Sequence, residues 1–134
     1  MSQENVELIR EVSRAFNERD IEGMLRWVHP EVEIRIIGGF EDLVGGSFSG
    51  HAGARRFFTD WFATFETLEI DHEKFIEAGE QIVTISRLKG TVEGSASPAE
   101  VRSGIVWRFK EGKISEYAGF YNVRDALEAV GLSE

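Results

Sequence analysis

A single carboxylate, Glu116, stands among apolar side chains near the end of the sequence. The alternating residues from 101 to 121 predict two antiparallel strands joined by a two-residue turn at Glu111-Gly112. Such a turn pairs Trp107 with Glu116 and places the carboxylate on a mostly apolar face. A buried carboxyl group is costly unless it is paired, hydrogen-bonded or neutral, and burial raises its pKa towards the range of proton transfer. Glu116 is therefore a candidate general base, and the alternative is a salt bridge to Arg87 or another arginine in a non-catalytic cavity.

The preceding hairpin supplies two further candidates, Arg87 and His72. A turn centred on residues 79 and 80 pairs these two residues and places both on one face. Arg87 can anchor an anionic substrate or stabilise developing negative charge, and His72 can transfer protons. The alternatives are an ion pair between Arg87 and an acidic neighbour, and a partly exposed His72 on the sheet. A slip of one residue in either hairpin would exchange the two faces.

Aromatic side chains are expected to line a pocket beside these groups. A helix predicted over residues 51–65 carries an aromatic stripe, and such a stripe is most often part of a core. Its remaining members can form the wall of a cavity. The predicted pocket-lining residues are Trp27, Phe62, Trp107 and Phe120.

The opposite face of the last hairpin has a different composition. It carries Arg108, Tyr117 and Tyr121. Tyrosine and arginine are enriched at the centres of protein interfaces. We therefore assign this face to a homodimer interface.

The helices and strands that position these residues follow from hydrophobic periodicity. Apolar residues recur at helical spacing from Val6 to Phe16, and Asp20 is a suitable N-cap for a second, short helix. Pro30 is expected to end that helix because the residue before a proline avoids the α region. Residues 38–50 are predicted to form a loop with a short extended piece near Phe48. The other predicted elements are a strand over 31–37, a helix over 51–65, strands over 68–77, 82–93, 101–110 and 113–121, and a closing helix capped by Asn122 and stopped at Gly131.

The composition excludes several classes of function. The 134 residues include 24 acidic and 15 basic side chains, and the net charge of −9 disfavours nucleic acid and anionic membranes as partners. The absence of cysteine excludes disulfides and thiolate chemistry, and the three histidines have no ligand spacing, so we expect no cofactor and no metal. No apolar run is long enough to span a bilayer, and the first residues lack a signal-peptide pattern, so a cytoplasmic protein is expected.

Several stretches of the sequence match the pattern of a known family. They are the opening ENVELIREVSRAFNERDIEGMLRWVHPEVE, the segments FSGHAGARRFF and FIEAGEQIV, and the closing VWRFKEGKISEY with ALEAVGL. In these stretches the sequence resembles the SnoaL-like proteins of the nuclear transport factor 2-like superfamily, relatives of ketosteroid isomerase and of polyketide cyclases. The resemblance implies one α+β domain over residues 1–134, with helices packed on the concave face of a curved, mixed or antiparallel sheet and a C-terminal helix. It also implies a homodimer formed through the sheet.

The resemblance does not include the catalytic set of ketosteroid isomerase. Those enzymes place an aspartate on the first strand, where Ile34 stands in this sequence, and a tyrosine on the first helix, which has none here. Polyketide cyclases use a carboxylate near the end of the sheet, the region that contains Glu116.

Two functional hypotheses follow from the residues and the resemblance together. The leading one is a protein that binds a hydrophobic small molecule and acts as a cofactor-independent isomerase or cyclase by general acid/base proton transfer. The alternative is a non-catalytic ligand-binding or dimeric assembly module of the same fold. A dehydratase or epoxide hydrolase is disfavoured because such relatives need more polar groups in the pocket than the sequence supplies.

Overall fold

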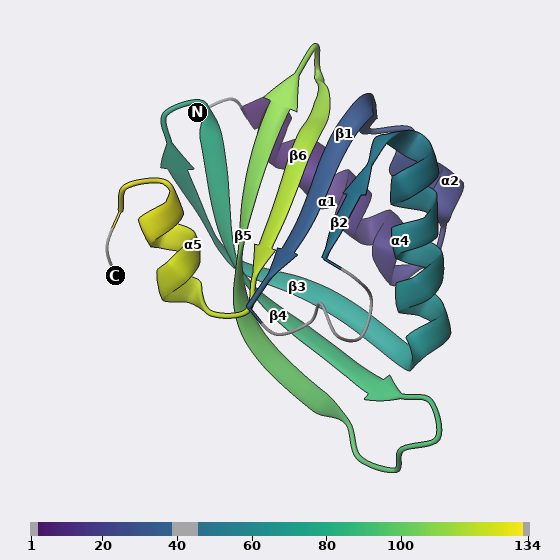
Figure 1. Cartoon of the computed structure of the whole chain (residues 1–134). Coiled ribbons are helices and arrows are strands. Elements are labelled where there is room, and N and C mark those ends of the chain that lie inside the picture. Colours follow the sequence, from purple (N-terminus) through teal and green to yellow (C-terminus); the bar gives the residue numbers. More distant parts are fainter. Residues whose placement is uncertain (1–2, 39–45, 133–134) are drawn as a thin grey trace.

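The computed structural model describes residues 3–38 and 46–132, which form a bent six-stranded sheet with helices on both faces (Figure 1). The strand order is β2-β1-β6-β5-β4-β3; β1 and β6 run parallel, and the other neighbouring pairs run antiparallel. This architecture confirms the predicted α+β fold with a closing helix. The elements are α1 (Gln3–Asn17), α2 (Ile21–Leu25), β1 (Val28–Ile37), β2 (Ser47–Ser49), α4 (Gly50–Thr64), β3 (Phe65–Ala78), β4 (Gln81–Val92), β5 (Ala99–Lys110), β6 (Lys113–Phe120) and α5 (Val123–Ala129).

The helices divide the core into two clusters. α1 buries Val6, Ile9 and Val12 in a cluster that also contains residues of α2 and α4. α5 buries Ala126 and Leu127 in a second cluster on the other side of the sheet. Figure 1 shows α1 behind the sheet and α5 at the left, away from the other helices. We call the face under α1, α2 and α4 the inner face, and the face that carries α5 the outer face.

The segment between α1 and β1 has the predicted cap but a different strand start. The Asp20 carboxylate accepts a hydrogen bond from the Gly23 amide at 2.9 Å, which confirms it as the N-cap of α2. β1 begins at Val28, so the helix end expected at Pro30 and the strand start expected at residue 31 are both wrong. The strand can include Pro30 because its pairing with β6 is irregular between Val28 and Glu33. Proline has no backbone N–H, and at this position no regular interstrand hydrogen bond is lost.

The glycine-rich stretch contains the short extended piece expected near Phe48. This piece is β2, in which Phe48 pairs with Ile34 of β1. Residues 39–45 of the expected loop lie outside the described residues.

The last hairpin has the predicted turn. Lys110 pairs with Lys113, and the φ values of Glu111 and Gly112 are 54° and 75°. Positive φ at both central residues is the requirement of a type I′ turn, whose twist matches that of the flanking strands.

Beyond this turn, a β-bulge changes the predicted register of β6. Ser115 is an extra residue in the ladder, so Glu116 pairs with Arg108, and Tyr117 pairs with Trp107. The predicted pairing of Trp107 with Glu116 is therefore wrong. An extra residue exchanges the faces of the residues that follow it, because side chains alternate along a strand. Tyr117 lies on the inner face, and Glu116 lies on the outer face.

A second bulge has the same effect in β3. The predicted pairing next to the turn between β3 and β4 is confirmed, but the register shifts at Glu73. As a result, His72 pairs with Ser86, and Arg87 pairs with Asp71. The predicted pairing of His72 with Arg87 is wrong, and the two side chains lie on opposite faces.

Gly104 allows α5 to approach the outer face closely. A Cβ atom at Gly104 would lie 2.4 Å from the Cβ atom of Ala126. α5 begins where the Asn122 side chain accepts a hydrogen bond from the Asp125 amide at 2.9 Å, and Gly131 follows the helix with a φ of 80°. Both the predicted cap and the predicted stop of this helix are therefore confirmed.

Candidate functional site

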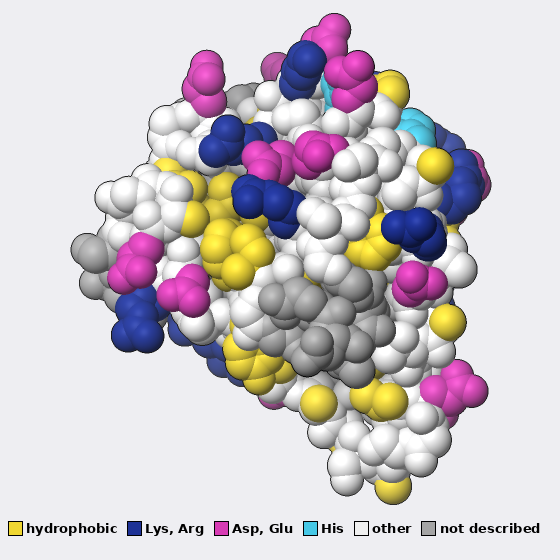
Figure 2. Space-filling view, viewed as in Figure 1, with side chains coloured by type: hydrophobic (Ala, Val, Ile, Leu, Met, Phe, Trp, Pro, Cys, Tyr) yellow, Lys and Arg dark blue, Asp and Glu magenta, His cyan; other side chains and the backbone are white. Residues whose placement is uncertain are grey.

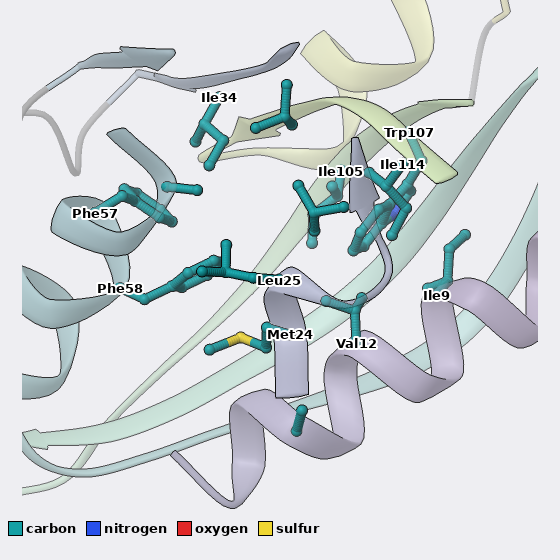
Figure 3. Packing of buried hydrophobic residues seen from close by; sticks show 14 of the residues in the cluster. Ile9, Val12, Met24, Leu25, Ile34, Phe57, Phe58, Ile105, Trp107 and Ile114 are labelled. Carbon is teal, nitrogen blue, oxygen red and sulfur yellow. The ribbon is translucent and has the colours of Figure 1, made fainter. Parts of the chain in front are cut away.

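A small apolar cavity lies between the inner face of the sheet and the helices that cover it. Its volume is about 40 Å³. Figure 3 shows Val12, Met24 and Phe58 reaching from three helices towards the side chains of the sheet. Ser13 and Tyr117 are the lining residues that carry a hydroxyl group, and no acidic or basic side chain of the described residues lines the cavity.

A chain of polar side chains begins at the cavity wall. Ser13 Oγ lies 2.7 Å from His72 Nε2, and Ser86 Oγ lies 2.7 Å from His72 Nδ1. Ser86 donates a hydrogen bond to Thr84 Oγ1 at 3.0 Å, and the Trp107 indole donates to the same oxygen at 2.9 Å. The chain links α1 to three strands and gives each imidazole nitrogen a partner.

His72 is held in its neutral form by this environment. Burial lowers the pKa of His72 to about 4; Asp71 acts in the opposite direction, and Arg10 lowers the pKa further. A neutral imidazole donates from one nitrogen and accepts at the other, which matches the two hydroxyl partners. The structure thus places His72 on the inner face, one hydrogen bond behind the residue Ser13 that lines the cavity.

Tyr117 is part of the cavity wall, whereas the sequence placed it on the interface side. Its ring packs edge-on against Trp107, with ring centroids 5.0 Å apart and ring planes at 89°. Burial raises the pKa of the Tyr117 phenol, so the hydroxyl remains protonated. No residue in the described part of the chain forms a hydrogen bond with this hydroxyl. A protonated phenol without a partner is available to a ligand.

A second cavity, of about 20 Å³, adjoins the first. Tyr117 and Ile70 line both cavities and therefore separate them. The wall of the second cavity also includes Trp61, Ser103 and Phe120.

Glu116 lies on the outer face, which removes the geometric basis for its expected role as the base in the pocket. Its carboxylate oxygens lie 2.7 Å from Arg35 Nη2 and 3.0 Å from Arg108 Nε. Figure 2 shows acidic and basic side chains side by side on this face, next to an apolar area. The alternative of an arginine salt bridge describes Glu116 better, with Arg35 and Arg108 rather than Arg87 as the partners.

Arg87 also projects from the outer face. It forms ion pairs with Glu73 and, at 3.3 Å, with Glu100; Arg102 approaches Glu73 from the next strand at 3.4 Å. The hydrogen bonds to Glu73 and Glu100 raise the pKa of the Arg87 guanidinium. These contacts match the alternative of an acidic neighbour, and they leave Arg87 across the sheet from the cavity.

The four aromatic residues expected around the pocket lie in different places. Trp107 lines the main cavity, and Phe120 lines the second one. Phe62 packs against Phe16 of α1, with ring centroids 5.4 Å apart, and does not line the main cavity. Trp27 lies in a groove beside α1 on the surface. The structure therefore brings Trp107 to the main cavity without Trp27 or Phe62.

The sequence analysis missed Ser13 and Tyr117 as pocket residues. Ser13 follows Val12 and lies one turn from Ile9 and Phe16, on the buried side of α1. A polar residue within an apolar helical stripe is a signal that could have identified it. Tyr117 has no such signal, because its face depends on the bulge in β6.

The remaining histidines form contacts with residues that are distant in the sequence. His29 Nε2 lies 2.7 Å from Glu111 Oε1, and His51 Nε2 lies 2.8 Å from the Val28 carbonyl oxygen. Within residues 3–38 and 46–132, no group of three or more histidine, aspartate or glutamate side chains is arranged to hold a metal ion. The helices of the same residues include none that is long and apolar enough to cross a bilayer.

Comparison with known families agrees with this architecture. The sequence pattern of the SnoaL-like domain matches residues 9–117. No curated protein matches the chain.

Solved structures of the same shape include forms crystallised with organic molecules. TerC, co-crystallised with polyporic acid, is 26% identical with a TM-score of 0.81, over 96% of this chain and 98% of that one. An NTF2-like protein of unknown function from Burkholderia pseudomallei is 25% identical with a TM-score of 0.81, over 98% and 99% of the two chains. Rv0760c from Mycobacterium tuberculosis, in complex with estradiol-17beta-hemisuccinate, is 22% identical with a TM-score of 0.77, over 91% and 96%.

Proposed function

The chain belongs to the SnoaL-like domain family, and we propose on this basis that it binds an uncharged, hydrophobic small molecule in the cavity of the inner face. The observation that carries the proposal is the cavity lining. Apolar walls with a few hydroxyl groups are typical of small-molecule sites, and a lining without charged side chains disfavours ionic ligands. The ligand-bound structures of TerC and Rv0760c support a ligand site in this fold.

Binding requires the cavity to open. Its volume of about 40 Å³ is far below the roughly 300–1,000 Å³ of ordinary ligand pockets. Met24 is the wall residue best suited to move, because its unbranched side chain has several rotatable bonds. A bound molecule occupies the space that a side chain such as Met24 vacates, and it then packs against the residues of the core.

The three tryptophans provide a direct test of this site. We would titrate para-propyltoluene into protein labelled with nitrogen-15 and follow the indole N–H signals by NMR. The signal of Trp107, which lines the cavity, is expected to shift in a saturable way, while that of Trp27 in the surface groove stays in place. A saturable shift at Trp27 alone, or no saturable shift at all in either wild type or the enlarged Met24→Ala cavity, would reject the proposal.

A second candidate function is proton transfer on the bound molecule. The observation that favours it is the 2.7 Å contact between Ser13 Oγ and His72 Nε2, because Ser13 lines the cavity and can relay a proton to the imidazole. A base with a pKa of about 4 is comparable to the aspartate base of ketosteroid isomerase, whose pKa is about 4.6. The Tyr117 phenol can donate a hydrogen bond to an oxygen that becomes negative.

This reaction class can be tested without knowing the natural substrate. Para-propylacetophenone carries an enolisable methyl group on an uncharged aromatic body. In heavy water, wild type is expected to accelerate deuterium uptake into that methyl group, and His72→Gln is expected to lose the acceleration. Uptake no faster than in buffer, despite binding, identifies the chain as a non-catalytic binding module.

We also propose that the chain forms a homodimer through the outer face. Arg108, whose side chain is 56% exposed on this face, and Tyr121, 43% exposed just beyond the end of β6, are residue types suited to an interface. Sedimentation equilibrium of wild type is expected to give twice the chain mass, and Arg108→Glu is expected to weaken the association. Tyr117 is no longer part of this interface, because it lies on the inner face.

A further inference from the structure

We propose that the second cavity is a subsite for an uncharged oxygen of the ligand, held between the hydroxyl groups of Tyr117 and Ser103. The inference rests on the proposed function, since the apolar body of the same molecule occupies the main cavity. It defines the ligand class as a mostly apolar molecule with a terminal hydroxyl or carbonyl group.

Two hydroxyl-bearing side chains of the second cavity, neither of which has a side-chain hydrogen bond among the described residues, point to this role. Ser103 is 7% exposed, and both Ser103 and Tyr117 line the second cavity. Over the described residues, neither side chain forms a hydrogen bond. A hydroxyl group that faces a cavity without a protein partner is left to bond with whatever occupies that cavity. A ligand oxygen that accepts or donates here satisfies both groups at once.

Gly119 directs the phenol towards this subsite. A Cβ atom at Gly119 would lie 3.3 Å from Tyr117 Cε1 and 3.7 Å from the Tyr117 hydroxyl. Gly119 itself lines the second cavity and not the first. The hydroxyl end of Tyr117 therefore lies on the side of the second cavity, and the glycine leaves room for the ring.

The size and the lining of the second cavity define the group that it accepts. About 20 Å³ accommodates one oxygen-sized group, for which roughly 10–15 Å³ is sufficient. Apart from the Trp61 indole N–H, the rest of the wall is apolar, and none of its described residues is charged. A carboxylate would lose its hydration without gaining a cation, whereas a hydroxyl or carbonyl needs only the two hydroxyl partners.

The position of the subsite relative to the main cavity defines the shape of the ligand. Tyr117 and Ile70 line both cavities, so a molecule that reaches the subsite passes between them. Ser103 is the cross-strand partner of Ser86, which holds His72. The oxygen of the ligand therefore lies near the polar chain.

A matched pair of ligands tests the subsite. Para-propylphenol and para-propyltoluene have nearly the same shape and differ in one hydroxyl group. We would measure the Kd of each by calorimetry for wild type, Tyr117→Phe and Ser103→Ala. Tyr121→Phe, which removes the same hydroxyl from an exposed ring, is the matched control.

The expected result is that wild type and the control bind the phenol about fivefold more tightly than the toluene. In Tyr117→Phe and Ser103→Ala this preference is expected to fall below twofold, while the Kd for the toluene stays nearly constant. A preference that persists in both variants, or wild type that binds both molecules equally, overturns the subsite and leaves the proposed function standing. Binding of neither molecule to wild type or to Met24→Ala overturns the proposed function together with the subsite.

Discussion

Glu116 and Tyr117 are consecutive residues that project from opposite faces of the sheet. The Glu116 carboxylate pairs with Arg35 and Arg108 on the outer face, and the Tyr117 ring packs against Trp107 beside the inner cavity. The extra residue in β6 determines which of the two reaches the cavity. The pocket therefore contains a phenol where a regular hairpin would have placed a carboxylate.

Replacing Glu116 by Gln is expected to leave ligand binding unchanged, because the carboxylate lies across the sheet from the cavity. The stability is expected to fall by up to about 1 kcal/mol, since the arginine partners are half exposed to solvent. Urea unfolding and titration with para-propyltoluene measure the two effects. Arg35→Gln in the same background isolates the coupling of the pair. A tenfold loss of ligand affinity in Glu116→Gln would contradict this assignment.

The stability is expected to depend on pH through His72. The imidazole has a pKa of 6.5 in the unfolded state and of about 4 in the folded state. As the pH falls, the unfolded state is therefore protonated at a higher pH than the folded state, which favours unfolding. The contribution of His72 to the free energy of unfolding is complete above pH 6.5 and decreases as the pH drops from 6.5 to about 4. Below that pH the contribution no longer changes. The predicted total loss is roughly 3 kcal/mol.

Urea unfolding of wild type and of His72→Gln at several pH values isolates this contribution. The variant is expected to be less stable at neutral pH, because it loses part of the hydrogen-bond chain, and to depend less on pH between 4 and 6.5. Equal slopes for the two proteins would show that His72 does not cause the dependence.

Tyr117→Phe is expected to leave the free protein as stable as wild type or to stabilise it. The variant removes a hydroxyl that has no hydrogen-bond partner among the described residues and keeps the ring against Trp107. Thermal unfolding without ligand measures the effect. A loss of more than about 1 kcal/mol would mean that the hydroxyl has a structural partner. If Tyr117→Phe is more stable than wild type but binds para-propylphenol more weakly, the hydroxyl serves ligand binding and lowers the stability of the free protein.

Gly104→Ala is expected to destabilise the protein by about 1–3 kcal/mol, because the new methyl group collides with Ala126 of α5. The double variant Gly104→Ala, Ala126→Gly exchanges the two side chains and is expected to recover much of the loss. The recovery is incomplete because glycine weakens a helix by about 1 kcal/mol. Chemical unfolding of the three proteins completes the cycle. A double variant no better than the sum of the single changes would exclude a direct contact.

Local patterns in the sequence predicted most of the fold. The helical spacing from Val6 to Phe16, the caps Asp20 and Asn122, and the turn at Glu111 each act within a few residues. Such features are encoded locally, so a sequence displays them directly. Together with the family resemblance, these local features predicted the α+β architecture. The predicted hairpins also pointed to His72 as a candidate site residue.

The tertiary structure alone decided which side chains meet in the cavity. The bulge at Glu73 places His72 and Arg87 on opposite faces, and the bulge at Ser115 places Glu116 on the outer face and Tyr117 on the inner face. Side chains alternate between the two faces of a strand in either register, before or after a shift of one residue. The alternation alone therefore does not show where a bulge shifts the register. The bulge is selected by non-local contacts, in which the bent sheet buries the Tyr117 ring beside Trp107 and leaves the ionic groups in water.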